Sequence, residues 1–251
     1  MMAAFMEWHP VVQVFVYALI TALATGLGAL PFIFIRGVSD RIVAFSNATA
    51  AGLMLGASFS LLAEGTKHGG AATFIGANLG VLFILITQRL LGNHDTESTF
   101  LGTSGANARR MMLVLVVMTV HSFAEGAAVG VSFGGGMGLA TAITLAVAVH
   151  NIPEGLAISA VLRPRGASIL ACVGWSIFSS LPQPITAVPA YLFVDHFTIA
   201  LPYGLGFAAG AMVFMVLVEL LPEAYGQAWA RHVGAITAVT LVAMLLVQRY
   251  L

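Results

Sequence analysis

Long apolar runs separated by short polar connections make up most of this chain. The hydrocarbon core of a bilayer is ~30 Å thick, so a helix needs about 20 apolar residues to cross it. Eight runs reach that length: 11–35, 42–65, 71–91, 110–134, 138–162, 167–194, 199–225 and 232–249. The pattern predicts an all-α polytopic membrane protein with eight transmembrane helices in a single domain, residues 1–251.

Composition supports a membrane location and excludes several partners. Of the 251 residues, 59% are hydrophobic and 8% charged, whereas soluble domains carry about 25% charged residues. Ten basic and ten acidic side chains give a net charge of zero, which argues against a nucleic-acid partner. Cys172 is the only cysteine, so neither an internal disulfide nor a thiolate metal cluster can form.

The basic residues predict how the chain lies in the membrane. Eight of the ten fall in the first, third, fifth and seventh connections: Arg36, Arg41, Arg89, Arg109, Arg110, Arg163, Arg165 and Arg231. Only Lys67 and Arg249 lie on the other side. Because cytoplasmic loops carry the excess of Lys and Arg, we expect both termini outside. The polar loop 92–109 is then cytoplasmic, and the plasma (inner) membrane is the expected location.

A short internal repeat predicts the architecture. Residues 50–54 (Ala-Ala-Gly-Leu-Met) in the second run resemble residues 208–212 (Ala-Ala-Gly-Ala-Met) in the seventh, and Glu64 and Glu223 follow near the ends of these runs. The two runs point in opposite directions across the membrane. This pattern predicts a 3+2+3 arrangement, with an inverted repeat of helices 1–3 and 6–8 around helices 4–5, a common transporter plan.

A second repeat carries the chemistry. Residues 120–126 (Val-His-Ser-Phe-Ala-Glu-Gly) recur as 149–155 (Val-His-Asn-Ile-Pro-Glu-Gly), near the middle of the fourth and fifth runs. His and Glu four residues apart project from one helix face. Two neighbouring helices therefore offer two imidazoles and two carboxylates to one point, and these residues are His121, Glu125, His150 and Glu154.

Neighbouring residues extend this ligand set. Ser122 and Asn151 add oxygen atoms at the edge of the same helix faces, and Gln183, between Pro182 and Pro184 in a run that the prolines should break, is a further oxygen donor. Nitrogen and oxygen donors without thiolate suit zinc, iron or manganese better than copper(I).

Charge balance also favours a cation. An ionised carboxylate at mid-membrane costs at least ~3 kcal/mol, and no Lys or Arg lies near the middle of a run to compensate for Glu125 and Glu154. They must be protonated, hydrated or neutralised by a cation from outside the chain. The repeat therefore indicates a metal or proton site. On composition alone, Met54 is an ordinary core residue. Four further polar residues either are solvated at helix ends or line the ion's path: Glu64, His68, Glu219 and Glu223.

Other functions fit the residues less well. An intramembrane metal-dependent hydrolase needs a positioned base beside an open metal position, and Glu125 or Glu154 could serve as that base. However, the His-Glu-x-x-His signature is absent, and no serine or cysteine nucleophile is paired with a base. A proton-conducting or purely structural membrane protein is the remaining alternative.

Taken with the eight runs, these motifs resemble the ZIP family of divalent-metal transporters. The resemblance covers nearly the whole chain, and residues 150–155 (His-Asn-Ile-Pro-Glu-Gly) are close to the family's most recognisable motif. It implies transport of zinc, or of iron, manganese or cadmium, toward the cytoplasm, without a cofactor, by a homodimer. It also implies two metal positions: the first with His121, Glu125, His150, Glu154 and nearby Met54, the second with Ser122, Asn151, Glu125, Glu154 and Gln183. Many bacterial relatives have glutamate at the position of Gln183.

Overall fold

The computed structural model describes residues 9–35, 39–91 and 106–250, and within these ranges all regular secondary structure is helical. The α-helices are α2 (Pro10–Leu27), α3 (Asp40–Leu91), α4 (Ala106–Ser132), α5 (Met137–Leu162), α6 (Ile169–Ser180), α7 (Pro182–His196), α8 (Leu201–Met215), α9 (Leu221–Gln227) and α10 (Ala230–Tyr250). The π-helical segment η5 (Val216–Leu220) joins α8 to α9. The predicted all-α class is confirmed.

Six described helical stretches are long and apolar enough to cross a membrane. They are Pro10–Ile33, Asp40–Thr87, Met137–Arg165, Ile169–His196, Thr198–Gln227 and Ala230–Tyr250. Their number and hydropathy agree with the prediction of a polytopic membrane protein.

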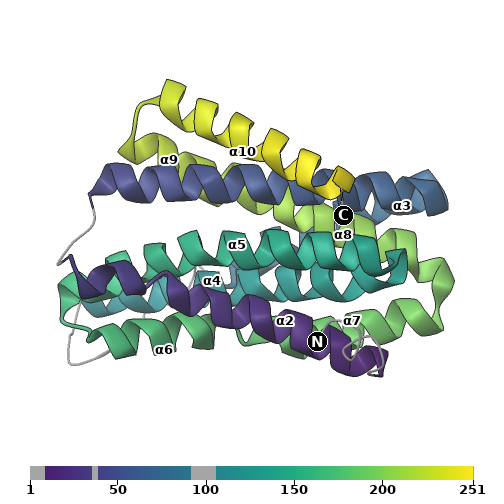
Figure 1. Cartoon of the computed structure of the whole chain (residues 1–251), viewed down its shortest axis with the longest axis horizontal. Coiled ribbons are helices and arrows are strands. Elements are labelled where there is room, and N and C mark those ends of the chain that lie inside the picture. The colour runs from purple at the N-terminus through teal and green to yellow at the C-terminus, as the bar shows by residue number, and fades with distance from the viewer. Residues whose placement is uncertain (1–8, 36–38, 92–105, 251) are drawn as a thin grey trace.

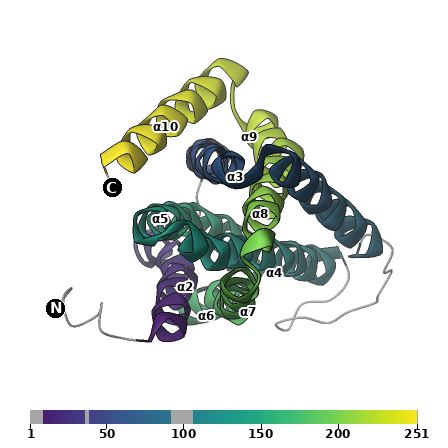
Figure 2. The ribbon, with the colours of Figure 1, turned by 90° about the vertical axis from the view of Figure 1, so that its right-hand side faces the viewer.

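Helix α3 contains the second and third predicted runs. Its 52 residues are more than twice what one crossing requires. The backbone leaves helical geometry at Gly69, where φ is 165° and ψ is 101°. Figure 2 shows the second leg of α3 turning away from the first. The two runs are therefore joined by a kink instead of a separate loop.

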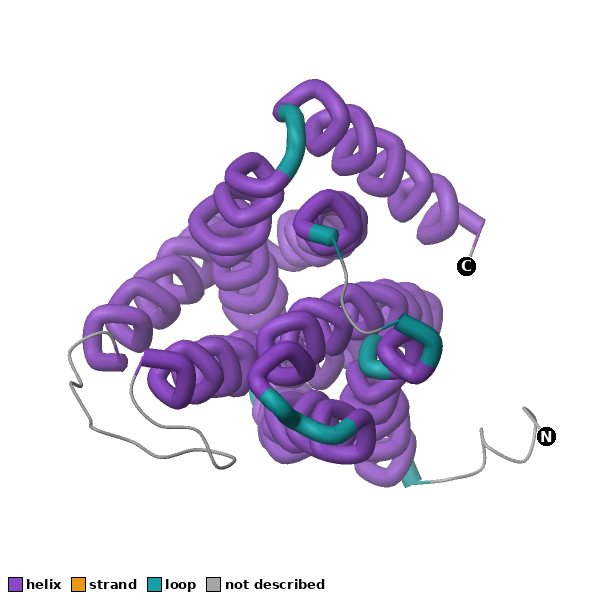
Figure 3. The backbone as a smooth tube through the Cα atoms, turned by 90° about the vertical axis from the view of Figure 1, so that its left-hand side faces the viewer, coloured by secondary structure: helices purple, strands orange, loops and turns teal. Residues whose placement is uncertain are grey.

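The helices lie side by side along the long axis of the molecule (Figure 1). Helices α4 and α5 lie between α3 and α8–α10 on one side and α2, α6 and α7 on the other (Figure 2). The view from the opposite end shows helices and loops in the described part of the chain (Figure 3). Helix α2 begins and α10 ends at the same end of the bundle, on the right of Figure 1. The helices that carry the His and Glu repeat are thus at the centre.

Proline and glycine set the local geometry around α4 and α5. The sixth predicted run is broken as expected: α6 ends at Ser180 and α7 begins at Pro182, which has no N–H to continue the ladder. A Cβ on Gly126 would collide with the backbone of Gln183, and one on Gly155 with the carbonyl of Thr25. The missing side chains therefore let α4 approach α7 and let α5 approach α2 at the level of the predicted site.

The boundary of one predicted loop changes. Residues 92–109 were expected to form a polar loop, but α4 already begins at Ala106. The remaining residues of that loop, 92–105, lie outside the described part of the chain.

Candidate metal centre

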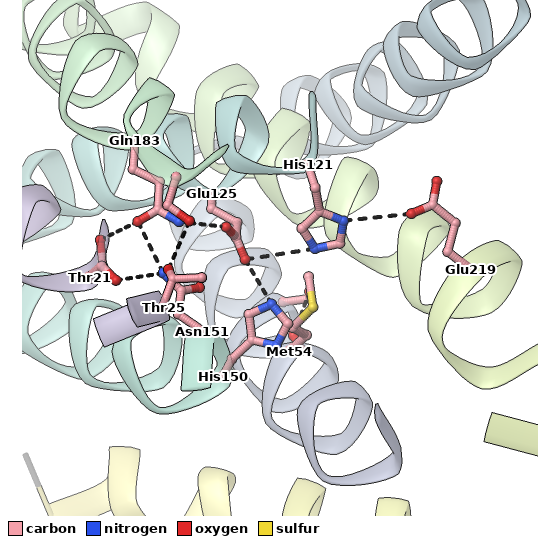
Figure 4. Close-up of polar contacts among 11 residues, drawn as sticks. Thr21, Thr25, Met54, His121, Glu125, His150, Asn151, Gln183 and Glu219 are labelled. Atoms are coloured by element: carbon pink, nitrogen blue, oxygen red, sulfur yellow. Dashed lines mark hydrogen bonds and ion pairs between the residues drawn. The ribbon is translucent and has the colours of Figure 1, made fainter. Parts of the chain in front are cut away.

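Three of the four predicted His and Glu side chains meet between α4 and α5 (Figure 4). One ligand atom from each of His121, Glu125 and His150 lies within 4.8 Å of the others. His150 Nε2 is 2.8 Å from Glu125 Oε1, and His121 Nε2 is 3.7 Å from the same oxygen. All three side chains are at least 98% buried. The i to i+4 spacing within α4 and the packing of α5 against it together form this cluster.

The cluster is poor in hydrogen bonds. Within the described part of the chain, both ring nitrogens of His121 and of His150 and Glu125 Oε1 have no hydrogen-bond partner of normal geometry. Both oxygens of Glu154, which is 4% exposed, also have none. Buried polar atoms are normally satisfied because leaving one unpaired costs about 1–3 kcal/mol. A shared divalent cation would satisfy this donor set, which contains imidazole nitrogen and carboxylate oxygen.

A cavity of about 300 Å³ lies beside the cluster and gives it a route out of the bundle. Its polar lining comes from His121, His150, Glu154, Asn47, Glu219 and Glu223. Asn47 lies near the start of α3 and Glu223 lies in α9, so the cavity extends toward the end of the bundle where α3 begins. Glu154 therefore faces the same cavity as the two histidines, although it is not one of the three clustered side chains.

The π-helical segment η5 brings one carboxylate to the cluster. Glu219 lies in this segment, and its Oε2 is 3.7 Å from His121 Nδ1 (Figure 4). The two nitrogens of His121 thus face different carboxylates, Glu125 on one side and Glu219 on the other. π-Helical bulges are frequent at functional sites because they change which residues face a neighbour.

The amide residues predicted as ligands form a separate hydrogen-bond network on the other side of Glu125. Gln183 Nε2 donates to Glu125 Oε2 at 2.7 Å. Gln183 Oε1 accepts from the Thr21 hydroxyl at 2.6 Å and from Asn151 Nδ2 at 3.2 Å. Asn151 Nδ2 also donates to the Thr21 carbonyl at 2.7 Å. The oxygen of Gln183 therefore faces Thr21 and Asn151, and its N–H faces the carboxylate.

The other predicted site residues lie at different distances from this centre. Ser122 is fully buried, and its hydroxyl has no hydrogen-bond partner among the described residues. Met54 is 2% exposed, and its thioether points toward the His150 ring in Figure 4. A ligand role for either residue stays a prediction.

Glu64 and His68 lie away from the centre, at the end of the bundle opposite the start of α3. Glu64 Oε1 is 3.3 Å from His68 Nε2, and its Oε2 is 2.7 Å from Lys67 Nζ. Glu64 and Lys67 line a second cavity of about 360 Å³. The predicted path residues therefore divide into two groups, Glu219 and Glu223 beside the metal centre and Glu64 and His68 beside the opposite cavity.

Two polar residues of the site were not predicted. Thr21 lies inside the first apolar run and Asn47 inside the second, and both are at most 1% exposed. The Nδ2 of Asn47 has no partner in the described chain. The signal was present in the sequence, because a polar side chain inside an apolar run is costly unless something pairs with it.

Comparison with known proteins identifies the family. Residues 92–246, more than half of the chain, match the sequence profile of the ZIP zinc transporters. The chain belongs to the ZIP family. It is therefore an integral membrane protein of a transporter family, not a member of a family of enzymes, and the predicted family is confirmed.

Relatives support the same assignment. The chain is 32% identical to the zinc transporter GufA of Myxococcus xanthus over 86% of its own length and 90% of that protein. It is 33% identical to the zinc transporter ZIPB of Bordetella bronchiseptica over 80% of its length and 69% of that protein. A candidate zinc transporter of Arabidopsis thaliana is 45% identical over 94% of this chain, but the match spans only 39% of the Arabidopsis protein.

Proposed function

We propose that this ZIP-family protein carries zinc, or a related divalent transition-metal ion, toward the cytoplasm through the centre formed by His121, Glu125 and His150, with Glu154 at its cavity side. The observation that carries the proposal is the approach of three Lewis-basic atoms within 4.8 Å at a fully buried position. Among the described residues, no Lys or Arg pairs with Glu125 or Glu154 to neutralise these carboxylates. The related proteins named as zinc transporters favour zinc over iron, manganese or cadmium.

The orientation is part of the proposal. Six apolar stretches become eight crossings if α3 counts as two and the 27-residue α4 is added. The cavity beside the metal centre then extends toward the end that carries Arg41, Arg163, Arg165 and Arg231, which the positive-inside rule assigns to the cytoplasm. An ion released from the centre would leave past Glu219 and Glu223, whereas Glu64 and His68 would meet ions arriving from outside.

Close packing supports the proposed inverted repeat. A Cβ on Gly52, in the first leg of α3, would collide with the backbone of α10 at Thr237, and one on Gly210 in α8 with Ala77 in the second leg of α3. In the predicted repeat, the second predicted helix corresponds to the seventh and the third to the eighth. The contact of the first leg of α3 with α10 therefore corresponds to the contact of α8 with the second leg of α3. The matching glycines therefore occupy matching contacts.

We further propose that this chain carries one ion at a time. The second metal position implied by the family resemblance would need Gln183, Asn151 and Ser122 as ligands. Gln183 directs an N–H toward Glu125, and its oxygen already accepts two hydrogen bonds. An amide N–H repels a cation, so Gln183 acts here as a positioning residue that holds Glu125 in place.

A flux assay tests the metal centre. Purified protein is reconstituted into liposomes that contain a zinc-sensitive dye, and wild type is compared with His150→Ala. The matched control is His196→Ala, which removes an exposed histidine at the end of α7. We expect zinc flux in wild type and control and none in His150→Ala. Equal flux in all three would place the centre elsewhere, and competition with iron(II), manganese and cadmium then ranks the metals.

A labelling assay tests the orientation. Cys172 is buried and is replaced by alanine, and single cysteines are placed at exposed Ser168 and exposed His196, at opposite ends of the bundle. With an impermeant thiol reagent outside intact cells, we expect labelling at position 196 and none at 168. Labelling at position 168 alone would show that this end of the bundle faces the outside. The cavity beside the metal centre would then extend toward the outside and not toward the cytoplasm.

A further inference from the structure

Another small pocket, with a different lining, lies where the first turns of α3 meet the connection between α9 and α10. Its volume is about 210 Å³, and its lining is Arg41, Phe45, Ala228, Trp229 and His232. These residues belong to helix ends at the left of Figure 1, the end where the basic residues gather. In a membrane-spanning bundle, such helix ends lie at the level of the lipid headgroups.

The lining of this pocket is aromatic and cationic, and Arg231 lies beside it, against the lining residue Trp229. The Arg231 guanidinium lies 4.8 Å from the centroid of the Trp229 ring, a cation–π distance. The His232 ring lies 5.8 Å from the Trp229 ring and 6.3 Å from the Phe45 ring. Among the residues that the structure describes, no carboxylate lines the pocket. Its lining therefore carries the positive charge of Arg41 whatever the protonation state of His232.

The arginines at the pocket differ from others at the same end of the bundle. Arg163 donates to the carbonyl of Ala167 at 2.9 Å, and Arg165 donates to that of Val161 at 2.7 Å, so both stabilise the end of α5. In the described part of the chain, Arg41 and Arg231 form no ion pair and no side-chain hydrogen bond. Their donors are free to bind an anion.

We propose that this pocket binds the phosphate of an anionic phospholipid headgroup. The guanidinium groups of Arg41 and Arg231 supply the positive charge, and basic pockets between helices on the cytoplasmic side are typical headgroup sites. Trp229 is 62% exposed and, with Phe45, offers an apolar surface to the glycerol and upper acyl chain. A free phosphate ion would gain nothing from this aromatic surface, so the lipid is the better fit.

The proposed lipid would stabilise a weakly packed helix. In the most apolar part of α10, only 17% of the residues are buried. In the most apolar part of the stretch that contains α5, 61% are buried. The pocket joins the start of α10 to the start of α3. A headgroup bound there would bridge the two helices at the end of the bundle toward which the cavity beside the metal centre extends.

Lipid titration followed by native mass spectrometry tests the proposal on the purified full chain. Phosphatidylglycerol and phosphatidylcholine with identical acyl chains are compared for wild type and the double variant R41Q/R231Q. The charge-matched control is K67Q/R249Q, which removes two basic residues at the opposite end. Each basic residue near an anionic surface contributes about fivefold in affinity, so R41Q/R231Q should bind phosphatidylglycerol about 25-fold more weakly.

The remaining outcomes are also decisive. The control should keep the preference of wild type for phosphatidylglycerol, and R41K/R231K should restore most of it. Equal losses in the two double variants, or no preference in wild type, would overturn the proposal. Displacement of the lipid by excess inorganic phosphate, together with phosphate binding on its own, would show a free-anion site and would also overturn it. The cytoplasmic placement of the pocket rests on the proposed orientation, but no step of this test depends on metal transport, so its failure is distinguishable from failure of the flux assay.

Discussion

Two clusters of polar side chains meet at Glu125, and they differ in how well their atoms are paired. On one side, His121 and His150 approach Glu125 Oε1 without a hydrogen bond of normal geometry to any described residue. On the other side, Gln183 donates to Glu125 Oε2 and accepts from Thr21 and Asn151. Both clusters are equally buried. The two clusters are therefore alike in burial and differ in hydrogen-bond satisfaction.

The comparison has a physical basis. A carboxylate that is held through one oxygen by an amide N–H keeps its position while its other oxygen stays available to a cation. Metal ligands are commonly oriented in this way by groups that do not touch the metal. The proposed function gives the amide network this orienting role toward Glu125, and variants of the two clusters test it.

The largest effect is expected from Glu125→Gln, which changes both clusters at once. The variant removes the negative charge between the two histidines but keeps a side chain of the same size beside Gln183. Zinc flux in the liposome assay should fall to that of protein-free liposomes, because the neutral amide is a poor zinc ligand. Asp195→Asn, at an exposed position near the end of α7, is the matched control and should retain most of the flux. Wild-type flux in Glu125→Gln would mean that the histidine side is not the transport site.

A change in metal stoichiometry is expected from Gln183→Glu. This variant places a second carboxylate beside Glu125, where Gln183 Nε2 now donates at 2.7 Å. The added anion favours another dication, so the bound zinc should rise from about one toward two ions per chain, with slower transport because a strongly held ion leaves less readily. Elemental analysis of the purified protein at saturating zinc measures the ratio.

The control for that change separates charge from the loss of the amide. Gln183→Met removes the hydrogen bonds to Glu125 without adding an anion, so it should not gain a second ion. If wild type already binds two ions, or if Gln183→Glu gains none, the amide does not determine the number of ions.

The smallest effect is expected from Thr21→Val, which removes one hydrogen bond to Gln183 Oε1. A hydrogen bond between helices in a membrane protein contributes about 1 kcal/mol to the free energy of unfolding. We expect the free energy of unfolding to fall by that amount and zinc flux to decrease modestly, since Gln183 then holds Glu125 less firmly. The control is Thr25→Val, whose hydroxyl lies 2.8 Å from that of Ser180, outside the network. It should lose similar stability but no flux, and an equal decrease in flux would show that Thr21 has no specific role.

The sequence predicted those features that depend on residues close together in the chain. Apolar runs of about 20 residues predicted the membrane helices, and the i to i+4 spacing placed His121 and Glu125 on one face of α4. The break before Pro182 was also predicted, because proline has no backbone N–H to donate to the helical hydrogen-bond ladder. These are local properties of a helix, and they hold whatever the helix packs against.

Only the tertiary structure decided which atoms face one another. Thr21 and Gln183 are 162 residues apart in the chain and Gln183 and Glu125 are 58 apart, so no local period relates them. The sequence offered the Gln183 oxygen as a ligand, but helix packing directs it to Thr21 and Asn151. Likewise, the approach of Glu219 to His121 joins side chains that are 98 residues apart in the chain, so no local period relates them. Hydropathy and spacing determined which helices exist and which faces are polar, whereas close packing between helices determined which polar atoms are paired and which remain available to an ion.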